Sequence, residues 1–146
     1  MQWLNMIRLE KSLVLFAQDE RTLRIIRRER FMSIDVSRMP KLGFGLMRLP
    51  EKDGKIDHEQ VCSMIDKYMQ AGMNYFDTAY IYHGGKSEAA AREALVKRYP
   101  RDSFMLATKL PAWEIKKADD VERLFNEQLN RAGVDYFEFC VFHGIT

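Results

Sequence analysis

The stretch NYFDTAYIYHGGKSE, residues 74–88, predicts a strand, a polar loop and a helix in immediate succession. Its first residues are typical of a strand, and the sequence turns polar at Asp77. Tyr82, a histidine and a lysine follow, before Ser87 and Glu88 provide the cap and the first-turn acid of a helix. Active sites on parallel sheets and barrels are built where a strand ends in an ionisable residue and leads into such a loop. We therefore expect a functional site at the end of this strand.

Strands and helices alternate on both sides of this stretch. Apolar runs predict strands at residues 41–47, 73–76, 104–108 and 136–142. Helices are predicted between them, with Asp57, Ser87 and Asp119 or Asp120 at their starts and Gly72, Pro100 and Gly133 at or beyond their ends. The pair Asp53-Gly54 predicts a turn. This order of elements predicts an α/β fold with a parallel sheet and right-handed crossovers.

Each predicted helix carries apolar residues at helical spacing. The first has Val61, Met64, Ile65, Tyr68 and Met69, the second has Ala91, Ala94 and Leu95, and the third has Val121, Leu124, Phe125, Gln128, Leu129 and Ala132. Each stripe is expected to pack against the sheet. The tyrosines of the strands and loops, Tyr75, Tyr80 and Tyr136, are interpreted as packing residues.

Three consecutive predicted strands end in ionisable residues, Asp77, Lys109 and His143. Because the carboxyl ends of parallel strands lie together, we expect these side chains to converge with Tyr82 of the loop. A carboxylate holds a neighbouring lysine charged, and an ammonium group beside a tyrosine makes the phenol a usable proton donor near neutral pH. A nearby histidine can hydrogen-bond a carbonyl oxygen. Such a set could protonate a carbonyl oxygen while a hydride reaches its carbon. None of these side chains can supply the hydride, which implies a nicotinamide cofactor.

Four motifs, in this order, resemble the aldo/keto reductase family. They are Gly43-Phe44-Gly45, Asp77-Thr78-Ala79-x-x-Tyr82, Ala107-Thr108-Lys109 and the closing His143. The resemblance implies that residues 39–146 are the first half, about four strands, of a TIM (β/α)8 barrel in an NAD(P)H-dependent oxidoreductase. Residues 41–50 and 82–85 are similar to a microbial branch that often carries a C-terminal iron–sulfur domain.

The resemblance also implies roles for individual residues. Tyr82 is the general acid, Lys109 assists it and Asp77 holds Lys109, while His143 orients the carbonyl of a small aldehyde or ketone. The cofactor, NADP(H) or NAD(H), is expected against Gly45, Leu46, Met47 and Asp77. Trp113 is expected to line the substrate pocket together with His143.

The sequence also departs from the family's pattern. Barrels of this kind take ~250 residues or more, whereas this sequence has 146 and ends after the fourth predicted strand. We therefore expect a truncated reductase that lacks most of the cofactor site. The alternative is a non-catalytic half barrel that self-associates through its open edge or needs a complementing second half. In addition, Gly144 follows His143 where many members have a larger residue, which changes the local substrate wall.

Residues 1–38 do not match the rest of the chain. They carry eight Lys or Arg and five Asp or Glu, whereas the whole chain has 23 and 21. Residues 21–30 are typical of a basic helix, which could bind a partner or an anionic surface. The interpretation we favour is an N-terminal extension, partly helical and outside the core. The apolar run at residues 13–17 is too short for a secretory signal.

Composition excludes several classes of protein. A net charge of +2 argues against a bulk nucleic-acid surface, and no apolar run reaches the ~18 residues of a membrane span. The two cysteines, Cys62 and Cys140, are far apart, which favours core-filling thiols in a reducing compartment, the cytoplasm, over a disulfide scaffold.

Three other chemistries are disfavoured relative to carbonyl reduction. Gly84-Gly85-Lys86-Ser87 resembles the end of a P-loop, but Tyr80 stands where that pattern needs its first glycine. Lys109 alone could be the Schiff-base lysine of a barrel aldolase. The three histidines, His58, His83 and His143, lack metal-ligand spacing, so no metal is expected.

Overall fold

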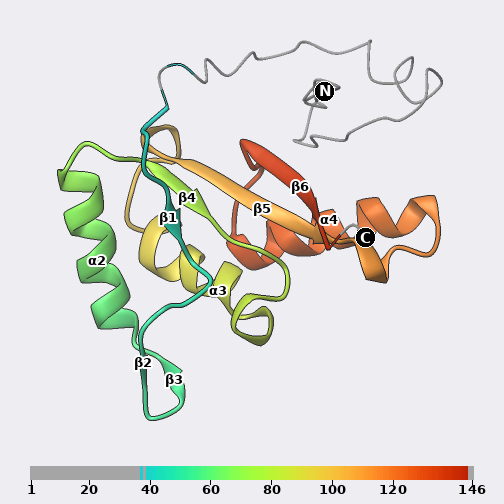
Figure 1. Ribbon diagram of the computed structural model, residues 1–146, viewed down its shortest axis with the longest axis horizontal. Helices are drawn as coiled ribbons and strands as arrows, with labels where there is room; N and C mark the ends of the chain where they lie inside the picture. The colour runs from blue at the N-terminus through green and yellow to red at the C-terminus, as the bar shows by residue number, and fades with distance from the viewer. Residues whose placement is uncertain (1–36, 38, 145–146) are drawn as a thin grey trace.

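Four parallel strands form the sheet that positions the rest of the chain (Figure 1). The structure is a computed structural model and describes residue 37 and residues 39–144. Across the sheet, the strands are β1 (Phe44–Gly45), β4 (Tyr75–Asp77), β5 (Met105–Pro111) and β6 (Phe139–His143). The helices are α2 (His58–Gln70), α3 (Ser87–Ala91) and α4 (Ala118–Ala132). The parallel pairing of all neighbouring strands confirms the predicted α/β fold.

The two faces of the sheet differ in chemistry. Thr108 lies beside Cys140 in the register, and both are buried, as is Leu106 two residues earlier. The Thr108 side chain contacts side chains of α3 and α4, so this face is the one covered by helices. Successive side chains of a strand point to opposite faces. Lys109 therefore projects from the other face, as does Asp77, which lies beside Ala107 in the register.

Helix α2 begins where the sequence predicts. The Asp57 carboxylate accepts the N–H of Gln60 at 3.0 Å and so caps one free donor of the first turn. Its core-facing side chains are Val61, Ile65 and Tyr68. Burying a side chain of this size contributes about 1.5–3 kcal/mol. Met64 was predicted to share this stripe, but it is 38% exposed, so the buried stripe is narrower than expected.

Helix α3 buries small alanine side chains together with Ser87 and Glu88. Ala90, Ala91 and Ala94 are buried, and the helix continues as a π-helical turn over Arg92–Val96. The predicted N-cap role of Ser87 is wrong, because Lys86 holds the cap position. Instead, the buried Ser87 hydroxyl bonds the Thr78 hydroxyl and the Leu46 carbonyl, both at 2.8 Å. These bonds join the helix to two neighbouring strand ends.

Helix α4 starts at Ala118, one or two residues earlier than predicted. The Asp120 carboxylate accepts the N–H groups of Lys116 and Lys117 at 2.9 and 3.1 Å, which satisfies donors at the helix start. The helix ends as predicted at Gly133, whose φ of 67° is left-handed and whose N–H bonds the Leu129 carbonyl at 2.8 Å. Its buried residues are Leu124, Phe125, Gln128 and Ala132.

A two-stranded antiparallel hairpin projects away from the sheet (Figure 1). It comprises β2 (Glu51–Lys52) and β3 (Lys55–Ile56), where the sequence predicted only a turn. Asp53 and Gly54 join the strands with φ angles of 51° and 71°. Two central residues with positive φ match the right-handed twist of paired strands, which is why an Asp-Gly pair closes a hairpin here.

The lengths of the strands differ from the prediction. β1 has only two residues, and β6 starts at Phe139. β5 continues to Pro111, because its ladder with β6 runs on to the Pro111–His143 pair. Lys109 therefore lies inside a strand and not at its end.

The predicted N-terminal extension, including the basic segment at residues 21–30, lies outside the described residues apart from Ser37. Within residues 39–144, no helix has both the length and the apolar character needed to cross a membrane.

Candidate active site

Asp77 occupies the end of β4 between two neighbouring strands. It pairs with Gly45 of β1 on one side and with Ala107 of β5 on the other. Its backbone carbonyl accepts the N–H of Leu46 at 2.8 Å, which fixes the chain after β1 against the end of β4. Its carboxylate is one-third exposed and binds the Lys109 ammonium. The carboxylate is thus held at the carboxyl edge of the sheet.

Lys109 lies two residues beyond Ala107 on β5, so its side chain projects on the same face just past the end of β4. Its Nζ also donates to the Thr78 carbonyl at 3.0 Å. The side chain is only 17% exposed. A largely buried ammonium needs such partners, and these two fix its position.

Tyr82 and His143 complete the cluster. Tyr82 opens a 3₁₀ turn, Tyr82–Gly85, and its ring centroid lies 4.8 Å from the Lys109 Nζ. His143 ends β6, and its ring lies 5.7 Å from the Tyr82 ring at an interplanar angle of 90°. The structure thus places Asp77, Lys109, Tyr82 and His143 at one edge of the sheet. A phenol between an ammonium and an imidazole has the parts needed to move a proton to or from a bound oxygen.

Trp113 forms a wall beside His143. It lies in the turn Ala112–Glu114 after β5, is 42% exposed, and its ring is 5.7 Å from the imidazole. Gly144 has a φ of 68°, and a Cβ there would lie 3.2 Å from the Trp113 ring. A larger residue at position 144 would therefore strain the backbone and displace Trp113, which explains why glycine suits this site.

In the segment Gly45 to Met47, Gly45 and Met47 lie at the surface and Leu46 lies in the core. A Cβ on Gly45 would meet nothing within 4 Å, and Met47 is 54% exposed. Leu46 is fully buried in the core. Gly45 and Met47 thus border open space, whereas the Leu46 side chain faces away from it.

A buried polar network lies behind Lys109. The Glu88 carboxylate accepts the Thr108 hydroxyl at 2.8 Å and the Gln128 amide at 2.7 Å. The same amide lies 3.1 Å from the Lys109 carbonyl. All three network side chains are buried, and burial raises the pKa of Glu88. The sequence predicts Glu88 only as a first-turn acid of a helix. Thr108 in an apolar strand and Gln128 in an apolar stripe are the signals that could have indicated its buried partners.

Arg131 of α4 supports the loop that leads to Tyr82. Its guanidinium lies 4.2 Å from the Tyr80 ring and donates to the Tyr80 carbonyl at 3.3 Å. It also binds Glu127 and lies 3.7 Å from Glu88. Nothing in the sequence pattern predicts this contact, because its partners are 51 residues apart.

The glycine-rich segment that resembles the end of a P-loop forms the turn before α3. Gly84 and Gly85 both have positive φ and lead through Lys86 into α3. Within the described part of the chain, no cluster of three or more His, Cys, Asp or Glu side chains could hold a metal ion.

The sequence and the fold of this chain are similar to those of known proteins of one family. The model of the aldo/keto reductase family matches residues 41–146. The oxidoreductase YqkF of Bacillus subtilis is 28% identical over 123 residues, which cover 77% of this chain and 37% of YqkF. Aldo-keto reductase AKR11C1 of Bacillus halodurans, solved in a holo form, is 30% identical with a TM-score of 0.59, over 73% of this chain and 36% of its own.

A Klebsiella pneumoniae aldo/keto reductase, solved with NADP and acetate, is 25% identical with a TM-score of 0.62. That match covers 72% of this chain and 35% of the Klebsiella chain. The chain thus spans little more than a third of the length of each of these relatives.

Proposed function

The chain belongs to the aldo/keto reductase family, and on that premise we propose that the whole protein reduces the carbonyl group of a small aldehyde or ketone with NAD(P)H. The four parallel strands correspond to the first half of the family's (β/α)8 barrel. The observation that carries the proposal is the Lys109 ammonium, bound to Asp77 and 4.8 Å from the Tyr82 ring.

Each residue of the cluster has a distinct role in this proposal. The Tyr82 hydroxyl gives its proton to the substrate oxygen, and the Lys109 ammonium stabilises the phenolate that remains. Asp77 keeps Lys109 charged and in place. His143 donates a hydrogen bond that orients the carbonyl, and Trp113 bounds the substrate on the His143 side.

The residues present fit one part of a nicotinamide cofactor. Gly45 leaves open space beside its Cα at the β1 edge, next to Asp77 and the exposed Met47. We propose that Gly45, Leu46, Met47 and Asp77 line the nicotinamide end, with Leu46 contributing through its backbone. When bound, NADPH or NADH supplies the hydride.

The proposal is tested by the consumption of NADPH or NADH with a broad substrate such as a nitrobenzaldehyde. Replacing Tyr82→Phe should lower kcat about 10²–10⁴-fold, the usual contribution of a general acid. Tyr136→Phe is the matched control, because this ring lies under Arg101 and away from the cluster. Full activity in Tyr82→Phe would remove Tyr82 from the chemistry.

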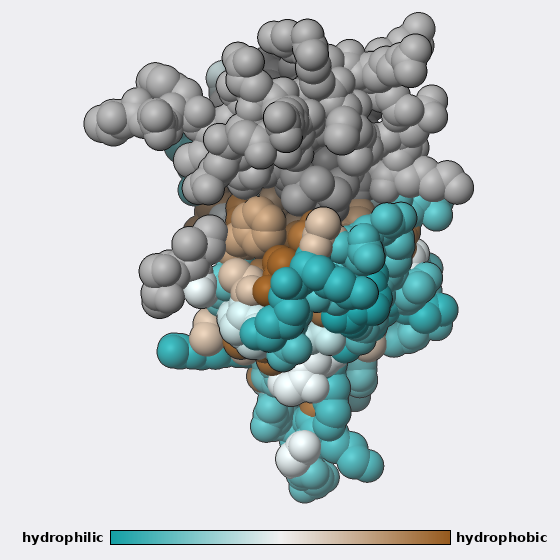
Figure 2. Space-filling view, turned by 90° about the vertical axis from the view of Figure 1, so that its right-hand side faces the viewer, coloured by the Kyte–Doolittle hydropathy of each residue, from teal (hydrophilic) through white to brown (hydrophobic). Residues whose placement is uncertain are grey.

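The second candidate is a non-catalytic half barrel that self-associates or requires a complementing half. β1 and β6 are the outer strands of the described sheet, and several large apolar side chains are exposed. They are Leu42, Met47, Met64, Ile81, Trp113 and Val141. Figure 2 shows brown, apolar surface near the middle of the view, just below the grey atoms, and mostly teal, polar surface beside it and toward the bottom. Turnover by the purified 146-residue chain would reject this candidate.

Two finer assignments rest on sequence features alone. The similarity of residues 41–50 and 82–85 to a microbial branch supports an iron–sulfur domain beyond this stretch, and sequence encoded downstream of Thr146 tests it. The two free cysteines support a reducing compartment, which fractionation of cells would test.

A further inference from the structure

His83, the residue immediately after Tyr82, adopts a backbone conformation that is unusual for a side chain with a Cβ. Its φ and ψ are 53° and 39°, in the left-handed region, and Gly84 follows in the same region. Left-handed backbone at a histidine is held only when surrounding contacts favour it, and such positions gather at functional sites. At His83, hydrogen bonds to the ring stabilise this backbone conformation.

Both ring nitrogens of His83 have partners. Nε2 accepts the backbone N–H of Leu49 at 2.8 Å, and Nδ1 lies 3.1 Å from the Glu51 carboxylate. The side chain is only 11% exposed. An imidazole nitrogen that accepts an N–H bond carries no proton, so the neutral ring has its hydrogen on Nδ1 and donates it to Glu51. Glu51 thereby selects the tautomer that Leu49 requires.

These bonds connect two segments of the site. Leu49 is buried and lies after β1, in the segment that begins at Gly45 and includes Met47. His83 stands beside Tyr82 in the turn after β4. The ring therefore bridges the segment proposed to meet the cofactor and the turn that holds the proposed acid.

We propose that His83 is a positioning residue, whose neutral ring holds the Tyr82 turn against Leu49 and thereby places the Tyr82 hydroxyl. This inference deepens the proposed function and rests on it for the role of Tyr82. The link between His83 and Leu49 is a statement about structure alone, so it can be tested separately.

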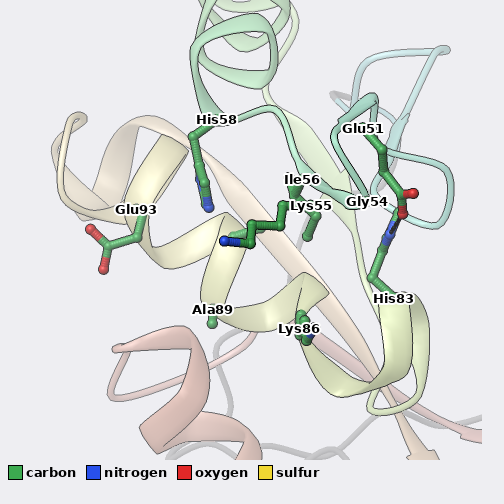
Figure 3. A pocket seen from close by; sticks show the side chains of 10 residues that line it. Glu51, Gly54, Lys55, Ile56, His58, His83, Lys86, Ala89 and Glu93 are labelled. Atoms are coloured by element: carbon green, nitrogen blue, oxygen red, sulfur yellow. Dashed lines mark hydrogen bonds and ion pairs between the residues drawn. The ribbon is translucent and has the colours of Figure 1, made fainter.

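The His83 ring lines a cavity of ≈ 490 Å³ between the hairpin, the start of α2 and α3 (Figure 3). The charged or titratable groups that line it with His83 are Glu51, Lys55, His58, Lys86 and Glu93. Figure 3 shows Glu51 turned toward His83, whereas Glu93 points away. Glu51 is therefore the cavity group whose carboxylate bonds the His83 ring.

The first test measures amide hydrogen exchange at Leu49 in the full chain. His83→Phe keeps a ring of similar size but has no acceptor, and we expect exchange at Leu49 to quicken about tenfold or more. His83→Gln restores an acceptor and should return most of the protection. His58→Phe, at the rim of the same cavity, is the control and should leave Leu49 unchanged. Equal exchange in His83→Phe and the original chain would overturn the proposal.

The second test measures turnover in the whole protein. We expect His83→Phe to lower kcat about tenfold with little change in KM, and His83→Gln to recover most of it. In a Tyr82→Phe background, His83→Phe should cost nothing further, because the two residues act as a unit. Additive losses would overturn the positioning role. A protein without turnover would contradict the proposed function, and the exchange at Leu49 would still decide the structural claim.

Discussion

Asp77 and Lys109 bind each other across neighbouring strands, and this pairing fixes where the ammonium lies relative to Tyr82. Replacing Lys109→Met removes the charge that we propose to stabilise a phenolate, while keeping the apolar stem. We predict that kcat of the whole protein falls about 10²-fold or more, since proton transfer then lacks its electrostatic support. Steady-state kinetics checks this, with Lys97→Met as the control because Lys97 is an exposed lysine paired with Glu93.

The two cysteines should differ in reactivity. Cys140 is buried on β6, and burial raises its thiol pKa to about 12. The thiolate is the form that reacts, so Cys140 has almost none of it at neutral pH. Cys62 is half-buried on α2. We predict that an alkylating reagent modifies Cys62 but not Cys140 in the native chain, and both in urea. Mass spectrometry of the peptides checks this, and native labelling of Cys140 at the rate of Cys62 would contradict it.

At the scale of elements, Glu88 joins α3 to β5 and α4 through Thr108 and Gln128. Burial raises the pKa of Glu88 above its ordinary value of 4.5. Above that pH, the folded state binds more protons than the unfolded state, so the free energy of unfolding falls as the pH rises toward the folded pKa. Glu88→Gln cannot titrate, so its free energy of unfolding does not fall in this way as the pH rises. We predict that the stability of Glu88→Gln relative to the original chain increases with pH through this window.

Urea unfolding followed by circular dichroism at several pH values measures this difference. Glu93→Gln is the control. Because Lys97 lowers the pKa of the exposed Glu93, that carboxyl affects stability below its ordinary pKa of 4.5, and we expect the relative stability of Glu93→Gln to stay constant through the Glu88 window. A relative stability of Glu88→Gln that stays constant across the window would show that the buried carboxyl is not proton-linked to folding.

The elements that sequence could predict are those set by local pattern. Alternating strands and helices imply a parallel sheet, and the edge of such a sheet must gather Asp77, Lys109 and His143. The bonds of Gln128, and the bond from Arg131 to the Tyr80 carbonyl, could not be predicted, because these partners are 19 to 51 residues away in sequence. Ser87 was misread because its local pattern fits a cap, whereas the approach of Leu46 gave its hydroxyl another partner.

At the scale of the whole molecule, the buried core lies within the sheet and its helices, from Leu46 to Cys140. We predict that residues 1–38 lie outside this core, so limited proteolysis should remove part of that segment while residues 39–144 remain intact. Mass spectrometry of the surviving fragment measures the boundary. Loops between residues 39 and 144 that are cut before any site in residues 1–38 would contradict this division.

The outer edge of β6 is the surface through which we expect copies of the chain to associate. Its Val141 is 40% exposed and lies beside Lys109 in the ladder, on the face opposite the helices. Its outer edge has no strand partner among the described residues, and an unpaired apolar edge favours association with another strand. We predict that the chain self-associates and that Val141→Lys weakens this, because a charge there must be desolvated when two copies pack.

Sedimentation velocity over a range of concentrations measures the change. Met64→Lys is the matched control, since Met64 is 38% exposed but lies on α2, away from the β6 edge. If both variants dissociate alike, the contact depends on net charge and not on β6. If only Val141→Lys becomes monomeric, the edge of β6 is the contact, and a complementing half barrel would compete for the same strand.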